Sequence, residues 1–483
     1  MASSTSMISA LCWIPKGVCK YEPEVAEQPS KEEIEDAIQS GALKFKRGDG
    51  EEDFDDEDEE MDIDAPGQAD EVGKALAAAR GLGCENKNRS GGGFQDISDA
   101  IRELNMDGYD SEEQNVEIFS SGLGDAYYPS NKLDPYLQND DDEDEDEIED
   151  MTIQPSDGII VCAHNDDEIN HLQVWVLEDP GDEESNMYSH HEILLPAFPL
   201  CMAWLDCNLK SEDKGNFIAV GTMDPAIEIW DLDVLDEVEP FKVLGGVVKS
   251  KKAKKSSLKY KKDSHKDSVL GLAWNKDFRN VLASASADKL VKVWDVATGK
   301  CVLTAKHHSN KVQAVTWNPY SPQLLLSGSF DHSIVLMDMN KEASITNRWS
   351  VPADVESLAW NPHSEDLFVV SLENGTIQGF DTRVASSCFT LHAHDKAVCS
   401  VAYNPVAPNL LATGSSDKTV KLWDMSNNKP SCIASTNRKA GSVFSLSFYE
   451  DSPFMLAIGG AKGKLKIWDT TKESEVAKRF KTA

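Results

Sequence analysis

The chain has 483 residues and a net charge of −37, with 84 Asp and Glu residues against 47 Lys and Arg residues. A content of 40% hydrophobic residues is ordinary for a globular protein and predicts a packed core. No apolar run approaches the ~20 residues that cross a bilayer, so we expect a soluble, intracellular protein. The ten cysteines form no CxxC pair, which favours buried free thiols over a disulfide framework.

The first predicted element is a strand over residues 8–14, within the stretch "ISALCWIPKG". It alternates apolar with small or polar residues, includes Leu11 and Trp13, and has no neighbouring strand in sequence with which to pair. A frayed terminus carrying a chance apolar cluster and a partner-binding peptide are the alternatives.

The segment 16–157 is acidic and is predicted to be mostly disordered. Residues 21–157 hold 43 Asp and Glu residues against 10 Lys and Arg residues, whereas residues 158–483 hold 41 and 35. The like-charge runs at 48–64 and 139–151 repel themselves and are expected to stay extended. They act either as solubilising tails or as shields that occupy basic partners.

Short apolar elements interrupt this acidic segment. Residues 30–43 begin with a capping-box pattern, and residues 94–106 also carry apolar residues at helical spacing. Residues 127–137 hold three tyrosines around prolines. These elements are either docking motifs that fold on a partner or elements that lie on the protein's own surface. Ser111, which precedes two glutamates, is a weak candidate for phosphorylation.

Residues 158–483 contain internal repeats that end in a Trp-Asp or a related pair. From Trp294 onward the marker positions are separated by 43, 43, 43 and 45 residues, and an aromatic "AWN"-like motif precedes each marker. Each unit between these markers has the pattern of four short strands. This period and strand pattern are typical of propeller blades, and the region resembles the WD-repeat family.

The first unit, which contains Trp175, lacks a first strand with its aromatic residue. Residues 8–14 have that pattern, so we expect them to return as the innermost strand of blade one. The predicted fold is therefore all-β: a seven-bladed WD-repeat β-propeller with four strands in each blade. The acidic segment becomes an insertion between the first two strands of blade one, which gives domain boundaries at 1–15, 16–157 and 158–483.

Polar residues recur at fixed positions in these repeats. In WD repeats such residues form a buried hydrogen-bond chain, and the resemblance implies this structural role here. Met337 replaces the Trp of its unit, which predicts a shorter chain there, and the unit ending at Phe380 lacks both the Trp and the turn Asp. The candidate network residues are His265, Asp288, Trp294, His308, Asp331, His394, Asp417 and Trp423.

No arrangement of side chains predicts a metal, a cofactor or an enzyme. The pairs His307–His308 and His392–His394 lack the further ligands that a zinc site needs. The glycine-rich stretches lack the Lys-Ser/Thr ending of a phosphate loop. We therefore expect no small-molecule substrate.

A lysine-rich loop at 248–263 separates blades two and three. It is read as a nuclear or nucleolar localisation signal, as a phosphate-contacting arm, or as a solvated loop. Its eight lysines are Lys249, Lys251, Lys252, Lys254, Lys255, Lys259, Lys261 and Lys262.

Motifs outside the repeats, among them "ALCWIPKGVCK", "SKEEIEDAI", "LDPYL" and "MDPAIEIWDLD", resemble the periodic tryptophan protein 1 family. The resemblance implies a nuclear, chiefly nucleolar, non-enzymatic factor in large ribosomal subunit assembly and pre-rRNA processing. The implied partners are assembly factors, ribosomal proteins and pre-rRNA. The alternatives are a histone-binding chromatin regulator and a ubiquitin-ligase substrate receptor, the latter because "FDTR" (380–383) partly matches the WDxR pattern.

Overall fold

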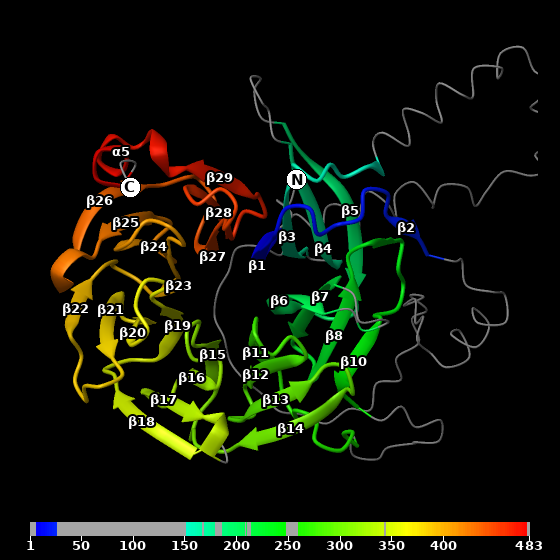
Figure 1. The fold of residues 1–483 in the computed structure, drawn as a ribbon, viewed down its shortest axis with the longest axis horizontal. Coiled ribbons are helices and arrows are strands. Elements are labelled where there is room, and N and C mark those ends of the chain that lie inside the picture. The colour runs from blue at the N-terminus through cyan, green and yellow to red at the C-terminus, as the bar shows by residue number, and fades with distance from the viewer. Residues whose placement is uncertain are drawn as a thin grey trace, which may run out of the picture. The chain divides into compact units, whose positions relative to one another are not determined.

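Seven β-sheets are arranged around a ring in the computed structural model, so the predicted seven-bladed propeller is confirmed (Figure 1). The structure describes residues 6–26, 151–166, 169–178, 186–207, 209, 214–247, 259–341 and 344–480. The acidic run at 48–64, the run at 139–151 except Met151, the predicted helices at 30–43 and 94–106, residues 127–137 and Ser111 lie outside these ranges. Among the described residues, no helix is long and apolar enough to cross a membrane.

Strand β1 (Met7–Ile14) is the inner strand of the first blade (Figure 1). It takes the position of the first strand that the repeat unit containing Trp175 lacks. It pairs antiparallel with β3 (Gly158–Asn165), with Trp13 opposite Ile160. The blade continues with β4 (Asn170–Leu177) and β5 (Met187–Leu195). Leu11 and Trp13 are buried, and a pairing irregularity near the start of β1 recurs near the start of all seven inner strands.

The next five blades each contain four described strands. Blade two consists of β6 (Pro199–Cys207), β7 (Lys214–Thr222), β8 (Ala226–Asp231) and β10 (Lys242–Gly245). Blade three consists of β11 (Val269–Trp274), β12 (Val281–Ser286), β13 (Val291–Asp295) and β14 (Lys300–Ala305). Blade four consists of β15 (Val312–Trp317), β16 (Leu324–Ser329), β17 (Ser333–Asp338) and β18 (Ser344–Ser350).

Blade five consists of β19 (Val355–Trp360), β20 (Leu367–Leu372), β21 (Thr376–Asp381) and β22 (Phe389–His392). Blade six consists of β23 (Val398–Tyr403), β24 (Leu410–Ser415), β25 (Val420–Asp424) and β26 (Ser431–Thr436). The part of the chain that the structure describes also has three short 3-10 helices: Met339–Lys341, Ser426–Asn428 and Thr470–Lys472.

The expectation of four strands in every blade is wrong for the last blade. Its described strands are β27 (Val443–Phe448), β28 (Met455–Gly460) and β29 (Lys466–Asp469). The chain then forms the helix α5 (Ser474–Phe480), whose Val476 and Phe480 are buried in the core between blades six and seven. The sequence after Trp468 is rich in charged residues at helical spacing, which favours this helix over an edge strand.

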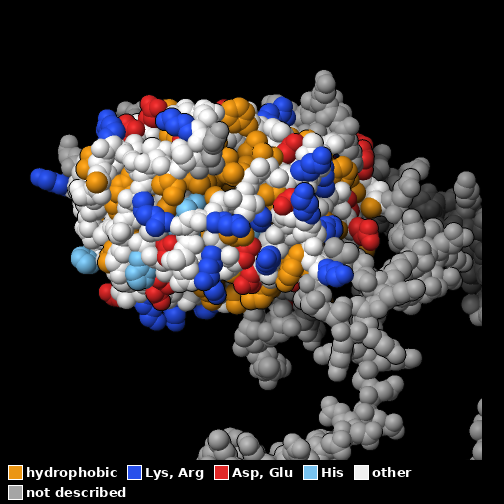
Figure 2. Space-filling view, turned by 90° about the horizontal axis from the view of Figure 1, so that it is seen from below, with side chains coloured by type: hydrophobic (Ala, Val, Ile, Leu, Met, Phe, Trp, Pro, Cys, Tyr) orange, Lys and Arg blue, Asp and Glu red, His pale blue; other side chains and the backbone are white. Residues whose placement is uncertain are grey.

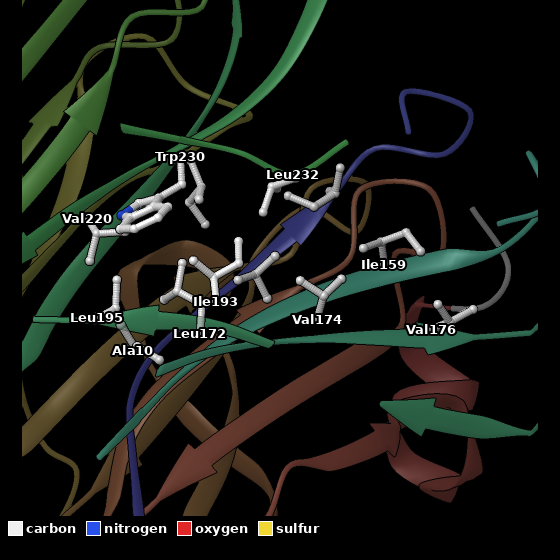
Figure 3. Packing of buried hydrophobic residues seen from close by; sticks show 14 of the residues in the cluster. Ala10, Ile159, Leu172, Val174, Val176, Ile193, Leu195, Val220, Trp230 and Leu232 are labelled. Atoms are coloured by element: carbon white, nitrogen blue, oxygen red, sulfur yellow. The ribbon is translucent and has the colours of Figure 1, made fainter. Parts of the chain in front are cut away.

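The core lies between adjacent blades. Second strands such as β3 and β12 are apolar or small along most of their length because neighbouring blades cover both of their faces. Between blades one and two, the cluster in Figure 3 joins Ala10 of β1 to Leu172, Val174 and Trp230. A small parallel pair that the sequence did not predict joins β2 (Glu24–Val25) to β9 (Val234–Leu235).

Candidate functional site

The predicted network residues of blade three lie together. His265 Nδ1 is 3.0 Å from Asp288 Oδ2, and His265 Nε2 is 2.7 Å from Ser284 Oγ. Trp294 Nε1 donates to the same Ser284 oxygen at 2.9 Å. The loop before the blade is thereby joined to its central strands.

This Asp-His-Ser order has the connectivity of a hydrolase triad, but its environment is structural. The exposed fraction of Ser284 is 0%, and its hydroxyl oxygen also accepts the indole hydrogen of Trp294. Burial lowers the pKa of His265, which favours the neutral form of its ring. Although burial opposes the shift, hydrogen bonds from His265 and from backbone amides hold the pKa of Asp288 below its usual value. His265 and Ser284 are both buried and bonded to each other, so they stabilise the blade and are not accessible to a substrate.

Blade six repeats this network with a threonine. His394 lies 2.8 Å from both Asp417 Oδ2 and Thr413 Oγ1, and Trp423 Nε1 donates to Thr413 at 3.0 Å. The loop, the hairpin and the third strand of the blade therefore converge on one buried hydroxyl group.

In blade four, a second histidine supplies the hydrogen bond that the missing Trp would make. His308 lies 3.0 Å from both Asp331 and Ser327. His307 Nε2 lies 3.0 Å from the same Ser327 oxygen, whereas Met337 has no group that could donate there. The hydrogen-bond network of blade four is therefore not shorter, contrary to the expectation from the sequence. The signal for this in the sequence was the adjacent pair His307–His308.

Blade five has no equivalent histidine network, but Asn374 replaces the turn aspartate. Its Oδ1 accepts hydrogen bonds from the backbone N–H and the hydroxyl of Thr376, at 3.1 and 2.6 Å. In the same blade Arg383 is held by Asp381, with N–O distances of 2.9 and 2.6 Å. The guanidinium group of the "FDTR" stretch is thus occupied within the blade.

His392 and His394, one of the pairs considered for a metal site, differ in burial. His392 is exposed on β22, whereas His394 is buried in its network. No group of three His, Cys, Asp or Glu side chains among the described residues has a geometry suited to a metal ion.

Aromatic side chains surround a cavity of about 830 Å³ at one end of the central channel. They come from the carboxyl ends of inner strands, where the "AWN"-like motifs lie. Trp204 and Trp274 meet edge to face, with centroids 5.5 Å apart. The lining rings are Trp13, Trp204, Trp274, Trp317, Phe448 and Tyr449.

The described base of the lysine loop is anchored on the propeller. Val247 forms a β-bridge with Tyr260, and Lys261 N donates to Gly246 O at 2.8 Å. Lys259, Lys261 and Lys262 are exposed beside this bridge. The remaining five loop lysines, Lys249, Lys251, Lys252, Lys254 and Lys255, lie outside the described residues.

Further lysines extend this basic region onto blades three and four. Lys266, Lys289, Lys306 and Lys311 are exposed, and no acidic side chain among the described residues pairs with them. In an antiparallel blade the first strand starts, the second and third strands meet, and the fourth strand ends at the same edge. These four lysines occupy such positions, so they lie on one propeller face. We name this surface, together with Lys259, Lys261 and Lys262, the basic face.

Charge is strongly segregated along the sequence of the repeats. Residues 158–248 hold 19 acidic and 3 basic residues, whereas residues 249–341 hold 7 acidic and 17 basic residues. The first region has a net charge of −16 and the second of +10, and residues 342–483 are neutral. Figure 2, viewed from the side where blades three and four lie, shows Lys and Arg side chains distributed over that side. Such a surface attracts phosphate groups electrostatically and without reading base sequence.

Comparison with known proteins agrees with this fold. Residues 242–482 match the family model described as the IFT122 first beta-propeller. The chain is 36% identical over 310 residues to an uncharacterized WD repeat-containing protein of Schizosaccharomyces pombe, which covers 62% of this chain and 56% of that relative.

Two other relatives carry a descriptive name. The chain is 33% identical over 307 residues to the Periodic tryptophan protein 1 homolog of Drosophila melanogaster, covering 62% of this chain and 56% of the relative. It is 32% identical over 338 residues to Periodic tryptophan protein 1 of Saccharomyces cerevisiae, covering 61% and 55%. The chain thus spans little more than half the length of these relatives.

Proposed function

We propose, from the premise that this chain is a WD-repeat protein related to Periodic tryptophan protein 1, that it is a non-enzymatic scaffold in ribosome assembly. It acts in the nucleus and nucleolus, where it promotes large-subunit assembly and pre-rRNA processing. WD propellers bind other proteins through several surfaces, and the relationship in sequence supports that coarse role.

The observation that carries the RNA contact is the basic face. Its four lysines on folded loops and hairpins, which have no acidic partner among the described residues, continue the lysine loop; they are Lys266, Lys289, Lys306 and Lys311. A short lysine-rich stretch alone would serve as an import signal, but lysines fixed on a folded surface suit an extended polyanion. We therefore assign pre-rRNA to this face and protein partners to the aromatic cavity at one end of the channel.

The acidic parts of the sequence support the same role through basic proteins. Residues 158–248, with a net charge of −16, and the runs at 48–64 and 139–151 attract ribosomal proteins or histones by charge. Histone binding makes a chromatin regulator the second candidate function. We also propose that the chain divides into domains after residues 15 and 157.

A direct test uses the full chain and a fragment of large-subunit rRNA. The triple variant Lys266→Glu, Lys289→Glu, Lys311→Glu should weaken RNA binding by at least tenfold at low salt, because three attractions become repulsions. The matched control Lys396→Glu, Lys418→Glu, Lys439→Glu changes exposed lysines of blades six and seven and should have a smaller effect. Equal losses in both variants would refute the assignment to the basic face.

The two candidate roles separate in cells. An assembly factor should sediment with pre-ribosomal particles and be released by RNase. A chromatin regulator should instead stay on chromatin after RNase and be released by salt. The second result would replace the ribosomal proposal with the chromatin one.

A further inference from the structure

Blade seven has an open edge where every other blade has a fourth strand. No described strand pairs with the outer edge of β29, and α5 packs toward blade six, where Arg479 bonds Asp424 at 3.1 Å. An unpaired strand edge presents free N–H and C=O groups that can bind another strand.

Elsewhere in the ring the fourth strand of one blade covers the marker residue of the next blade. Trp349 of β18 lies 6.0 Å, centroid to centroid, from Phe380 of blade five. Leu244 of β10 shares a core cluster with Trp294 of blade three. The missing fourth strand of blade seven would therefore cover Trp175, the marker residue of blade one.

Trp175 is less buried than its equivalents in the other blades. It is half-buried, whereas the six equivalent residues are at most 5% exposed. Those residues are Trp230, Trp294, Met337, Phe380, Trp423 and Trp468.

A cavity of about 620 Å³ lies at this place between blades seven and one. Its walls include Trp175 and Leu194 from blade one and Lys464 and Lys466 from blade seven. Leu194 is 62% exposed and presents an apolar side chain beside the cavity. A tryptophan and a leucine on one wall suit the apolar side chains of an added strand.

The charges at this cavity favour an acidic occupant. Lys462, Lys464 and Lys466 form no ion pair with a described residue. On the opposite wall Asp166 and Glu192 carry negative charges, and Gln173 Nε2 donates to Glu192 at 2.9 Å. Lys464 and Lys466 lie just before and at the start of β29, so the charge nearest to a strand that pairs with β29 is positive.

We propose that an extended, acidic segment of a partner protein adds to β29 as the fourth strand of blade seven. Its alternate apolar side chains contact Trp175 and Leu194, and its acidic side chains pair with Lys464 and Lys466. This binding mode is independent of the RNA contact on the basic face.

The test uses a synthetic peptide of alternating valine and glutamate with the purified full chain. Hydrogen exchange should slow at the amides of Lys466–Asp469 when the peptide binds, and should not change at β25, whose edge is already paired. Absence of protection at millimolar peptide would overturn the proposal.

Two variants, at the exposed Leu194 and Lys464 and the half-buried Lys466, test the contacts. Leu194→Ser and the pair Lys464→Glu, Lys466→Glu should each weaken peptide affinity, measured by fluorescence anisotropy, by roughly fivefold to tenfold. The control Lys396→Glu, Lys418→Glu on blade six should leave affinity unchanged. Unchanged affinity in the first two variants would also overturn the proposal, and unchanged RNA binding by Leu194→Ser would separate this site from the basic face.

Discussion

Trp13 of the inner strand of blade one stacks on Tyr449 of blade seven, with ring centroids 4.1 Å apart and planes inclined by 10°. The Trp13 indole also donates to Ser447 O at 3.1 Å. On its other side, the Ser9 hydroxyl donates to Pro199 O of blade two at 2.7 Å. Strand β1 is therefore fixed to both neighbouring blades, and it closes the ring through residues far apart in the chain.

The closure predicts that Trp13→Ala destabilises the whole propeller. It removes a buried ring, the stacking contact with Tyr449 and a hydrogen bond, so the free energy of unfolding should fall by about 3–5 kcal/mol. Chemical denaturation of the full chain measures this change. Phe278→Ala, at a residue that is 52% exposed, is the control and should cost less than about 1 kcal/mol. Equal effects would show that β1 contributes little to closure.

The shared hydroxyl of the blade six network predicts a second loss of stability. Thr413→Val keeps the shape of the side chain but leaves His394 Nε2 and Trp423 Nε1 without their partner. Two unsatisfied buried groups should together cost about 2–4 kcal/mol, measured as a lower denaturation midpoint. Ser371→Ala removes a buried hydroxyl whose only described bond is a long one of 3.4 Å, and it should cost less.

Histidine burial predicts acid sensitivity. Burial, followed by the neighbouring cationic groups of His308 and Arg348, lowers the pKa of His307 from 6.5 to about 4. Between these values the unfolded chain binds the additional proton, so the free energy of unfolding should fall as pH falls from 6.5 toward 4. His307→Gln should reduce the slope of that fall by up to about 1.4 kcal/mol per pH unit. An unchanged slope in thermal unfolding from pH 7 to pH 4.5 would contradict the assignment.

Glu356 on β19 predicts the opposite pH dependence. Burial, with the nearby charges of Glu373 and Asp354, raises its pKa from 4.5 to about 7. The folded state therefore retains a proton between pH 4.5 and 7, and stability is lost as pH rises through that window. Glu356→Gln should raise the free energy of unfolding, relative to the unchanged protein, more at pH 8 than at pH 5. Glu373→Gln removes one like charge and should give a smaller gain of the same sign.

The basic face predicts a change in the salt dependence of RNA binding. Replacing Lys266, Lys289 and Lys311 by Ala removes up to three phosphate contacts. The slope of log affinity against log salt should become shallower by about 2 for single-stranded RNA. Filter binding over a salt series measures it. A parallel line displaced to weaker affinity would show that these lysines do not touch phosphate.

Much of the fold was determined by the sequence itself. Regular marker spacing from Trp294 to Trp468 specifies four-stranded units, because each unit must bury its apolar strands against the next one. The same pattern identified residues 8–14 as the missing strand, since one inner position lacked an aromatic residue. The segregation of charge between residues 158–248 and 249–341 is likewise read from the sequence.

Only the tertiary structure decided which groups meet across blades. His307 takes the place of the absent Trp because Ser327 lies within reach, a distance that spacing along the chain does not define. The open edge of β29 beside Trp175 depends on where α5 packs, which the charge pattern that favours a helix there does not define. The order of the strands follows from local patterns. The open edge of β29 and the contacts between blades seven and one depend on packing among residues that are distant in sequence.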